Sequence, residues 1–273
     1  MDATPQTERI HSTALVDKQA RLGEGVEIGP YCTVGPHVTL ENGVRLISHV
    51  VIDGHTTVGA HSILHPFASL GLAPQHLHST GKDARLKIGE HTTIREHVTL
   101  HVGTEQGRME TKVGDHCFLM VGAHIAHDCI IGDNVILTNN VALGGHVTIG
   151  DYAVVGGLSG VHQHVRIGKH AMIGGVTGVE KDVIPYALAM GNRAKLTGLN
   201  IVGLRRRGFS REDIRSLRTA YGLLFSQGGT MSERLSEVAD LFSQHAGVMD
   251  IINFIREDSS RPICTPAANG NGG

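Results

Sequence analysis

Aliphatic residues recur at every sixth position through two thirds of this 273-residue chain. The count runs from Ile10 to Leu70, resumes from Ile88 to Leu100 and again from Val113 to Val179, and every position on it holds Ile, Val or Leu. A period of six predicts a parallel β-helix, in which each hexapeptide forms a short strand and a corner. Three hexapeptides close a triangular coil, and the coils stack at about 4.8 Å. Stacking buries the aliphatic side chains and gives each strand its backbone hydrogen-bond partners.

This repeat predicts an all-β solenoid over residues 1–190, with polar loops inserted at about 71–87 and 101–112. The composition agrees, because 36 glycines suit tight corners and an aromatic content of 4% leaves aliphatic residues to build the core. Loops that leave a rigid scaffold often carry binding residues. We therefore expect functional residues in or beside the two insertions.

Beyond Pro185 the apolar spacing becomes helical, and Ser210 with Asp213 forms a capping signal. The apolar face of this helix comprises Ile214, Leu217, Tyr221 and Leu224. With further helices expected over about 230–245 and 248–257, residues 191–259 are predicted to form an α-helical C-terminal domain. The polar tail, residues 260–273, is predicted to be disordered.

Charge and hydropathy exclude several classes of protein. The 24 Lys and Arg residues against 26 Asp and Glu give a net charge of −2, which argues against a nucleic-acid partner. No run of 18 apolar residues exists, so we expect no membrane span, and the first ten residues carry no secretory signal pattern. Four cysteines without CxxC spacing fit a reducing, cytoplasmic location.

Histidine is unusually frequent, with 19 residues. Ten of them, including His37 and His91, occupy the corner position of a hexapeptide and are interpreted as solvated corner residues. Three histidines, one of them among the ten corner residues, stand out because hexapeptides 18 residues apart stack on one edge. That edge carries His127, His146 and His162, with His124 just before it.

A carboxylate and a glycine pair accompany this histidine edge. Asp128 follows His127, and Gly144-Gly145 lies one coil further on. A histidine is suited to general-base chemistry near neutral pH, and an exposed glycine amide can stabilise an oxyanion. The pattern therefore favours acyl transfer. Two alternatives stay open: a zinc site on His124, His127 and His146, as in gamma-class carbonic anhydrases, and a solenoid with no site at all.

Four segments in order give a specific resemblance: AHIAHD at 123–128, LGGHV at 143–147, VHQ at 161–163 and GLNIVGLRRRGFSRE at 198–212. This series resembles the acyl-carrier-protein:UDP-N-acetylglucosamine O-acyltransferases, which begin lipid A synthesis. The resemblance implies a left-handed β-helix and a homotrimer with active sites between subunits. It implies an enzyme without a metal or cofactor, whose partners are a 3-hydroxyacyl carrier protein and UDP-N-acetylglucosamine.

The resemblance also implies roles for particular residues. His127 would be the general base that deprotonates the sugar 3-hydroxyl, Asp128 would support it, and the Gly145 amide would face the thioester oxyanion. Residues expected to contact sugar, nucleotide or acyl donor are Gln75, Leu77, His124, His146, His162, Gln163, Asn200, Arg206 and Arg207. Gly175, stacked on Gly157, would act as a ruler for the acyl chain and admit a long donor.

Two segments depart from the family pattern. The first insertion, which in the family usually reads Gln-Asp-Leu-Lys, here reads Gln75-His76-Leu77-His78, and Val202 replaces a glutamate. These changes could weaken nucleotide binding or accompany a 3-amino sugar. Separately, Arg211, Arg215 and Arg218 form a basic stripe on the predicted helix, which suits an acidic partner such as acyl carrier protein.

Overall fold

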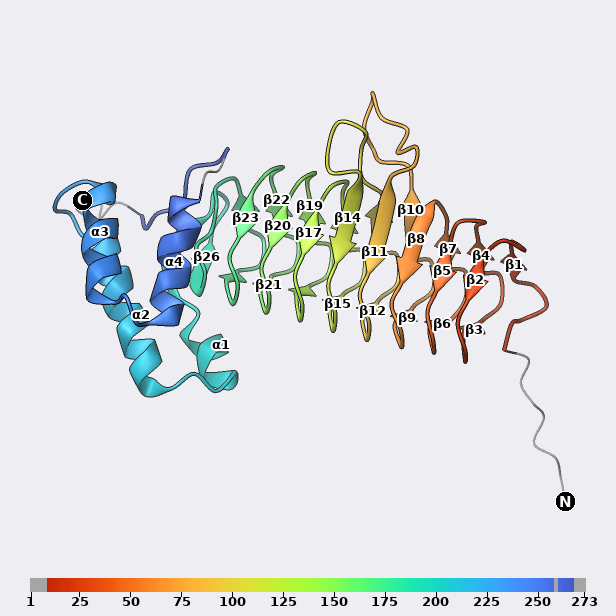
Figure 1. Ribbon diagram of the computed structural model, residues 1–273, viewed down its shortest axis with the longest axis horizontal. Coiled ribbons are helices and arrows are strands. Elements are labelled where there is room, and N and C mark those ends of the chain that lie inside the picture. The colour runs from red at the N-terminus through yellow and green to blue at the C-terminus, as the bar shows by residue number, and fades with distance from the viewer. Residues whose placement is uncertain (1–8, 258–259, 268–273) are drawn as a thin grey trace, which may run out of the picture.

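The computed structural model describes residues 9–257 and 260–267. Its first two thirds form a solenoid of parallel strands arranged in three sheets, and a group of helices packs at the C-terminal end (Figure 1). The chain visits the three sheets in turn, so that each circuit adds one strand to each sheet. The predicted β-helix is therefore the observed architecture.

Each sheet is named here by its number, and its strands are given in their spatial order. Sheet 1 has nine strands: β1 (Leu15–Val16), β4 (Thr33–Val34), β7 (Val51–Ile52), β10 (Ser69–Leu72), β13 (Thr99–His101), β16 (His124–Ile125), β19 (Ala142–Leu143), β22 (Gly160–Val161) and β25 (Gly178–Val179). Sheet 2 has eight: β2 (Arg21–Leu22), β5 (Thr39–Leu40), β8 (His55–Val58), β11 (Arg85–Ile88), β14 (Glu110–Val113), β17 (Ile130–Ile131), β20 (Thr148–Ile149) and β23 (Arg166–Ile167). Sheet 3 has ten: β27 (Lys195–Leu199), β26 (Ala187–Met190), β24 (Met172–Ile173), β21 (Val154–Val155), β18 (Ile136–Leu137), β15 (Phe118–Leu119), β12 (Thr93–Ile94), β9 (Ile63–Leu64), β6 (Arg45–Leu46) and β3 (Glu27–Ile28).

The six-residue count marks the solenoid core. Ile125 pairs with Leu143, and Leu143 with Val161, so the register advances by 18 residues per coil. These aliphatic side chains are at most 4% exposed, and the neighbouring strand residues point outward. Each such hexapeptide buries at least this aliphatic, and many also bury the residue two positions before it, such as Val147 before Ile149. This burial, together with continuous parallel pairing, stabilises the stack.

The corners between sheets repeat one backbone conformation. Many corner residues other than glycine have a positive φ, including His91 (52°), Asp128 (61°) and His146 (63°). Asn and Asp tolerate this left-handed region best, and His is also enriched there. The corner position of the histidines thus has a conformational explanation that the sequence period alone did not provide.

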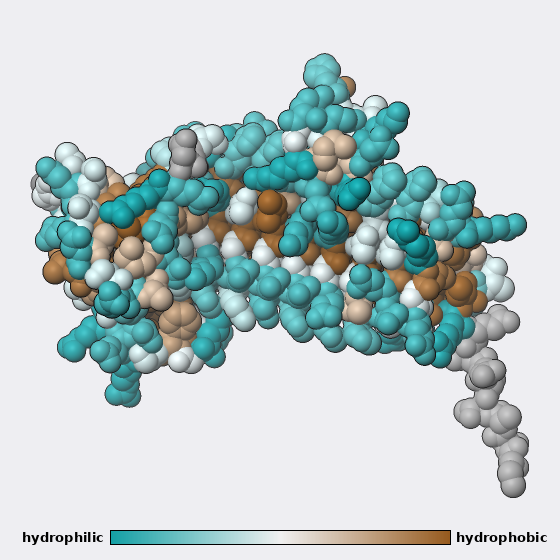
Figure 2. All heavy atoms as spheres, in the orientation of Figure 1, coloured by the Kyte–Doolittle hydropathy of each residue, from teal (hydrophilic) through white to brown (hydrophobic). Residues whose placement is uncertain are grey.

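Both insertions leave the solenoid at the same edge, between sheet 1 and sheet 2. The first loop spans residues 73–84, between β10 and β11, and the second spans 102–109, between β13 and β14. They project side by side from the solenoid (Figure 1), and their surface is mainly hydrophilic (Figure 2). We call this edge the loop-bearing edge.

The C-terminal helices are α1 (Ile201–Arg206), α2 (Arg211–Leu224), α3 (Met231–Leu241) and α4 (Ala246–Arg256). Ser210 and Asp213 form the predicted capping box of α2, whose face of Ile214, Leu217 and Leu224 is buried. The short helix α1 was not expected. The expected boundary at 190 falls inside an antiparallel hairpin, because β26 pairs with β27. None of the described helices is long and apolar enough to cross a bilayer.

The expectation of a disordered tail is wrong for residues 260–267. Ile263 bridges to Asp182, Pro266 bridges to Leu196, and the Cys264 side chain is fully buried. These contacts bind the tail to the end of the solenoid. Residues 268–273 lie outside the described part of the chain.

Candidate active site

His127 and Asp128 occupy the loop-bearing edge, one coil beyond the second loop. The Nδ1 atom of His127 lies 2.8 Å from Oδ2 of Asp128, and the His127 side chain is 13% exposed. The Asp128 carboxylate is fully buried and also accepts hydrogen bonds from Thr104 and from the Arg108 amide. Burial raises the pKa of the Asp128 carboxyl, but the hydrogen bonds from Thr104 and His127 outweigh it and hold that pKa below its ordinary value.

This pairing fixes the useful tautomer of the histidine. An ionised carboxylate can only accept, so Nδ1 of His127 carries the proton and Nε2 keeps its lone pair. The pair therefore presents a base at Nε2 and a buried anion that stabilises the imidazolium once Nε2 is protonated.

His146 lies beside the pair. Its ring centre is 5.2 Å from that of His127 at an angle of 88°, and its Nε2 atom lies 3.7 Å from Asp128 Oδ2. Burial lowers the pKa of His146, and the Asp128 carboxylate acts in the opposite direction. On its other side His146 stacks on His164, with ring centres 4.4 Å apart. His164 was interpreted as a solvated corner residue, and although it is exposed it continues this ring column.

Gly145 lies directly against the His127 ring. A Cβ atom at position 145 would come within 2.5 Å of His127 Cε1, so only glycine fits without displacing the ring. Among the described residues, the Gly145 amide donates to no backbone or side-chain acceptor. The site thus combines a base with a buried glycine whose N–H has no acceptor in the described part of the chain.

His124 and His101 line the same region from sheet 1. The Nδ1 atom of His124 lies 2.8 Å from the Thr99 hydroxyl, and the His101 and His124 rings meet edge to face at 5.3 Å. Burial lowers the pKa of both histidines, and for His101, helped by the charges of His124 and His127, to about 4. The Nδ1 atom of neutral His101 accepts a hydrogen bond from the backbone N–H of Gln75 (3.2 Å), and this bond anchors the first loop. Sequence reasoning missed this role, although His101 does break the hexapeptide register.

The first loop brings one of its unusual histidines to the site. The His76 ring packs edge-on against His127, with centres 5.4 Å apart, while Leu77 is 98% exposed. The second loop braces the first, because Glu105 accepts hydrogen bonds from Ser79 and Thr80. These bonds, above all that from the Ser79 hydroxyl, lower the pKa of Glu105 to about 2. The two loops therefore act as one unit beside His127.

His162 and Gln163 lie on the loop-bearing edge but are exposed and apart from the ring cluster. Within the described residues, His162 makes no ring contact, and its Nδ1 atom lies 2.6 Å from a guanidinium nitrogen of Arg261. The histidine edge expected from the sequence is thus divided. The His127 ring meets His146 edge to face and His164 stacks on His146, whereas His162 lies beside Arg261 of the tail.

The remaining expected residues lie on other faces of the solenoid. Asn200, Arg206 and Arg207 border a groove between α1 and the outward side chains of sheet 3. Asn200 is engaged structurally, because its side chain caps α1 at Gly203 and donates to the His170 carbonyl. Gly175 lies on the edge between sheets 3 and 1, where a Cβ atom would meet the Gly157 carbonyl oxygen at an ordinary 3.4 Å. Neither set lies on the edge that carries His127.

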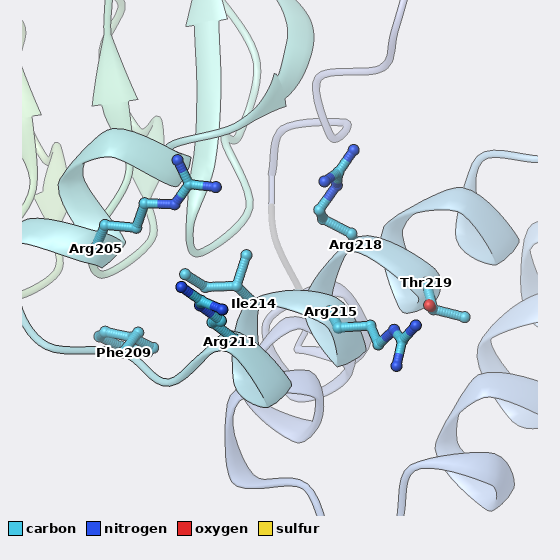
Figure 3. A pocket seen from close by; sticks show the side chains of 7 residues that line it. All are labelled: Arg205, Phe209, Arg211, Ile214, Arg215, Arg218 and Thr219. Carbon is cyan, nitrogen blue, oxygen red and sulfur yellow. The ribbon is translucent and has the colours of Figure 1, made fainter.

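The basic stripe borders a cavity of about 800 Å³. Arg205 comes from α1, whereas Arg211, Ile214, Arg215 and Arg218 follow one another along α2 (Figure 3). Arg211, Arg215 and Arg218 are exposed, as their spacing predicted.

Of the three histidines in the alternative zinc reading, the structure brings His127 and His146 together but not His124. Within the described residues, the one group whose ligand atoms lie within 4.8 Å of one another comprises His127, Asp128 and His146, and His124 is instead engaged with Thr99. His127 Nδ1 and the Asp128 carboxylate already satisfy each other. The geometry favours a proton-transfer pair over the zinc set of His124, His127 and His146 that the sequence left open as an alternative.

Family models match two parts of this chain. Residues 110–145 match the bacterial transferase hexapeptide repeat, and residues 182–264 match the second domain of UDP-N-acetylglucosamine O-acyltransferase. The fold and the site thus define a hexapeptide acyltransferase with a left-handed β-helix and a C-terminal helical part.

Relatives along nearly the whole chain make the assignment specific. The acyl-[acyl-carrier-protein]–UDP-N-acetylglucosamine O-acyltransferase of Bartonella henselae is 47% identical over 263 residues, which is 96% of each chain. The solved structure of the Moraxella catarrhalis enzyme is 42% identical, covers 93% of this chain and 99% of that one, and superposes with a TM-score of 0.91. The Acinetobacter baumannii structure is 43% identical, covers 94% and 100%, and has a TM-score of 0.88. This chain belongs to the UDP-N-acetylglucosamine O-acyltransferase family.

Proposed function

We propose that this acyltransferase moves a 3-hydroxyacyl chain from acyl carrier protein to the 3-position of UDP-N-acetylglucosamine, in the cytoplasm, as the first step of lipid A biosynthesis. The observation that carries the proposal is the His127–Asp128 pair with the Gly145 amide beside it. The names of the relatives support the acyl carrier protein and the nucleotide sugar as substrates.

The geometry supports one sequence of proton transfers. Nε2 of His127 accepts the proton of the sugar 3-hydroxyl while that oxygen attacks the thioester carbonyl. The Gly145 N–H stabilises the oxyanion, and Asp128 stabilises the imidazolium. When the tetrahedral intermediate collapses, the carbon–sulfur bond breaks and the imidazolium returns its proton to the leaving thiolate. No metal or cofactor takes part in this scheme.

The placement of the other expected residues supports a homotrimer. Asn200, Arg206 and Arg207 border sheet 3, and Gly175 lies on another edge, so one chain does not gather them around His127. Rotational symmetry would bring the loop-bearing edge of one subunit to the sheet 3 side of the next. On the edge between sheets 3 and 1, three exposed rings lie in a row with tilted contacts, and such a surface suits an interface: Tyr31, His49 and Phe67.

The cavity beside α2 is proposed as the docking site for acyl carrier protein. Arg205, Arg211, Arg215 and Arg218 border it. Cationic side chains of this kind favour an acidic partner and speed its association.

An assay with two acceptors tests the proposed reaction. Purified protein is given 3-hydroxyacyl carrier protein with UDP-N-acetylglucosamine or its 3-amino analogue, and acylated sugar is measured. We expect the hydroxyl acceptor to be used. Preference for the amine would move the proposal to N-acylation and would fit the changes at His76, His78 and Val202. If no 3-hydroxyacyl donor acylates either sugar, the proposed function is wrong.

A further inference from the structure

Asp128 is buried because the second loop covers it, whereas the equivalent residues of the next two coils are not covered in this way. Asp128, His146 and His164 occupy equivalent corners of three successive coils, each with a φ between 61° and 65°. The His146 side chain is 22% exposed and His164 is exposed, but the Asp128 side chain is 0% exposed. The second loop, residues 102–109, accounts for the difference, because its residues contact the Asp128 carboxylate.

Three donors of this loop fix the carboxylate. The Thr104 hydroxyl donates to Oδ2 at 2.6 Å, and the amides of Thr104 and Arg108 donate to Oδ1 at 3.2 and 2.6 Å. His127 bonds the same Oδ2 atom. A buried carboxylate without donors would be strongly destabilised, so these bonds keep it ionised and hold its plane toward His127.

The loop also approaches the backbone of Asp128. The Arg108 guanidinium donates to the Asp128 carbonyl at 2.6 Å, although Arg108 as a whole is exposed. A Cβ atom at Gly107 would come within 2.3 Å of Asp128 Oδ2, so the loop is shaped around the carboxylate.

We propose that Thr104 and Arg108 are positioning residues of the acyl-transfer reaction, and that the second loop is a clamp that orients Asp128 toward His127. This inference rests on the proposed function of His127 as the base. The clamp acts through Asp128, so it affects the rate of the chemical step and leaves substrate affinity nearly unchanged.

The test compares steady-state constants of matched variants. Thr104→Val keeps the branched shape and removes the hydroxyl, and we expect kcat to fall about tenfold with both KM values nearly unchanged, in keeping with the loss of one hydrogen bond to a charged group. Thr104→Ser restores the hydroxyl and should recover most of the rate. Thr92→Val is the control, because Thr92 is equally buried and bonds the Gly114 carbonyl away from the site.

A double-variant cycle separates positioning from general stability. In an Asp128→Ala background, Thr104→Val should reduce kcat no further. Arg108→Gln is a second variant for the case that Thr104→Val fails to fold, because Arg108 is exposed. It removes the hydrogen bond from the guanidinium to the Asp128 carbonyl, and we expect kcat to fall about threefold.

The inference is overturned if Thr104→Val costs no more than Thr92→Val, if Thr104→Ser does not recover the rate, or if Arg108→Gln leaves kcat unchanged. Failure of the proposed function looks different. In that case either the unaltered enzyme acylates neither sugar, or His127→Ala and Asp128→Ala retain activity, whatever the Thr104 variants do.

Discussion

Two edges of the solenoid carry columns of side chains in the same backbone conformation. On the edge between sheets 2 and 3, His61, His91 and His116 have φ values of 52–59°, and their rings stack 5.0 and 5.1 Å apart. On the loop-bearing edge, Asp128, His146 and His164 have φ values of 61–65°, and the two rings lie 4.4 Å apart. The repeat therefore builds both columns in the same way.

What differs is the surroundings of the columns. The three rings of the first column contact one another, and the described residues supply them with no carboxylate partner. The second column starts with a carboxylate that a loop holds in a buried position, next to His127. A histidine in the corner position is thus ordinary in this fold, and a loop-held anion is what distinguishes the candidate site.

The first prediction tests whether histidines on the two edges differ in their effect on kcat. His127→Ala should lower kcat by about 10²–10⁴-fold, the usual cost of removing a general base. His91→Ala and the exposed His37→Ala should leave kcat nearly unchanged. The measurement is kcat for the three variants together with thermal unfolding. Equal losses at His127 and His91 would show that the two edges do not differ in function.

The second prediction concerns space beside the base. Gly145→Ala would place a methyl group within 2.5 Å of His127 and displace the ring. Misplacing a catalytic group by an ångström costs roughly a hundredfold, so we expect a loss of that order in kcat. Gly160→Ala is the control, because a Cβ there meets no atom within 4 Å. A fully active Gly145→Ala enzyme would show that the close packing of Gly145 against the His127 ring does not matter for the reaction.

The third prediction concerns Gly175, on the edge between sheets 3 and 1. If Gly175 limits the acyl groove, Gly175→Met should favour a shorter donor and leave the chemistry at His127 intact. Excluding two buried methylenes at about 0.8 kcal/mol each would change the ratio of rates with long and short donors about tenfold. An unchanged ratio would remove Gly175 from the acyl groove.

The fourth prediction tests the helical region against the solenoid. Arg211→Glu with Arg215→Glu should raise the KM for acyl carrier protein about fivefold, because charges at the rim of an interface act on association. The KM for the nucleotide sugar should change little. For the unaltered enzyme, added salt should raise the donor KM alone. If added salt left the KM for acyl carrier protein unchanged, docking at this cavity would be contradicted.

The fifth prediction concerns acid stability. The pKa of Asp128 is held below its ordinary value in the folded protein, so its charge stabilises the fold above about pH 4. That contribution is lost as the pH falls through the folded-state pKa. Asp128→Asn, which suits the left-handed corner, should destabilise the protein by about 1–3 kcal/mol at pH 7 and by less at pH 3. An equal loss at both values would indicate that the charge does not matter.

The sequence period predicted much of this molecule. It located the core positions and the loops, because each hexapeptide buries one aliphatic side chain independently of distant contacts. Pairs such as His127 with Asp128, and the cap of Ser210 with Asp213, were also readable because they join near neighbours. The ordered tail was missed because Cys264 is buried against Asp182 and Ala194, which are far from it in sequence.

The solenoid, the position of its loop-bearing edge and the candidate base His127 could all be predicted from the amino-acid sequence. Only the stacking of the coils decided which histidines lie together: His164 instead of His162 stacks on His146, the first loop brings His76 against His127, and His101 contacts His124 within sheet 1. It also decided that Thr104 and Arg108 hold Asp128. The physical reason is that a repeat specifies local conformation, whereas contacts between a loop and a corner about 20 residues away depend on how the coils stack.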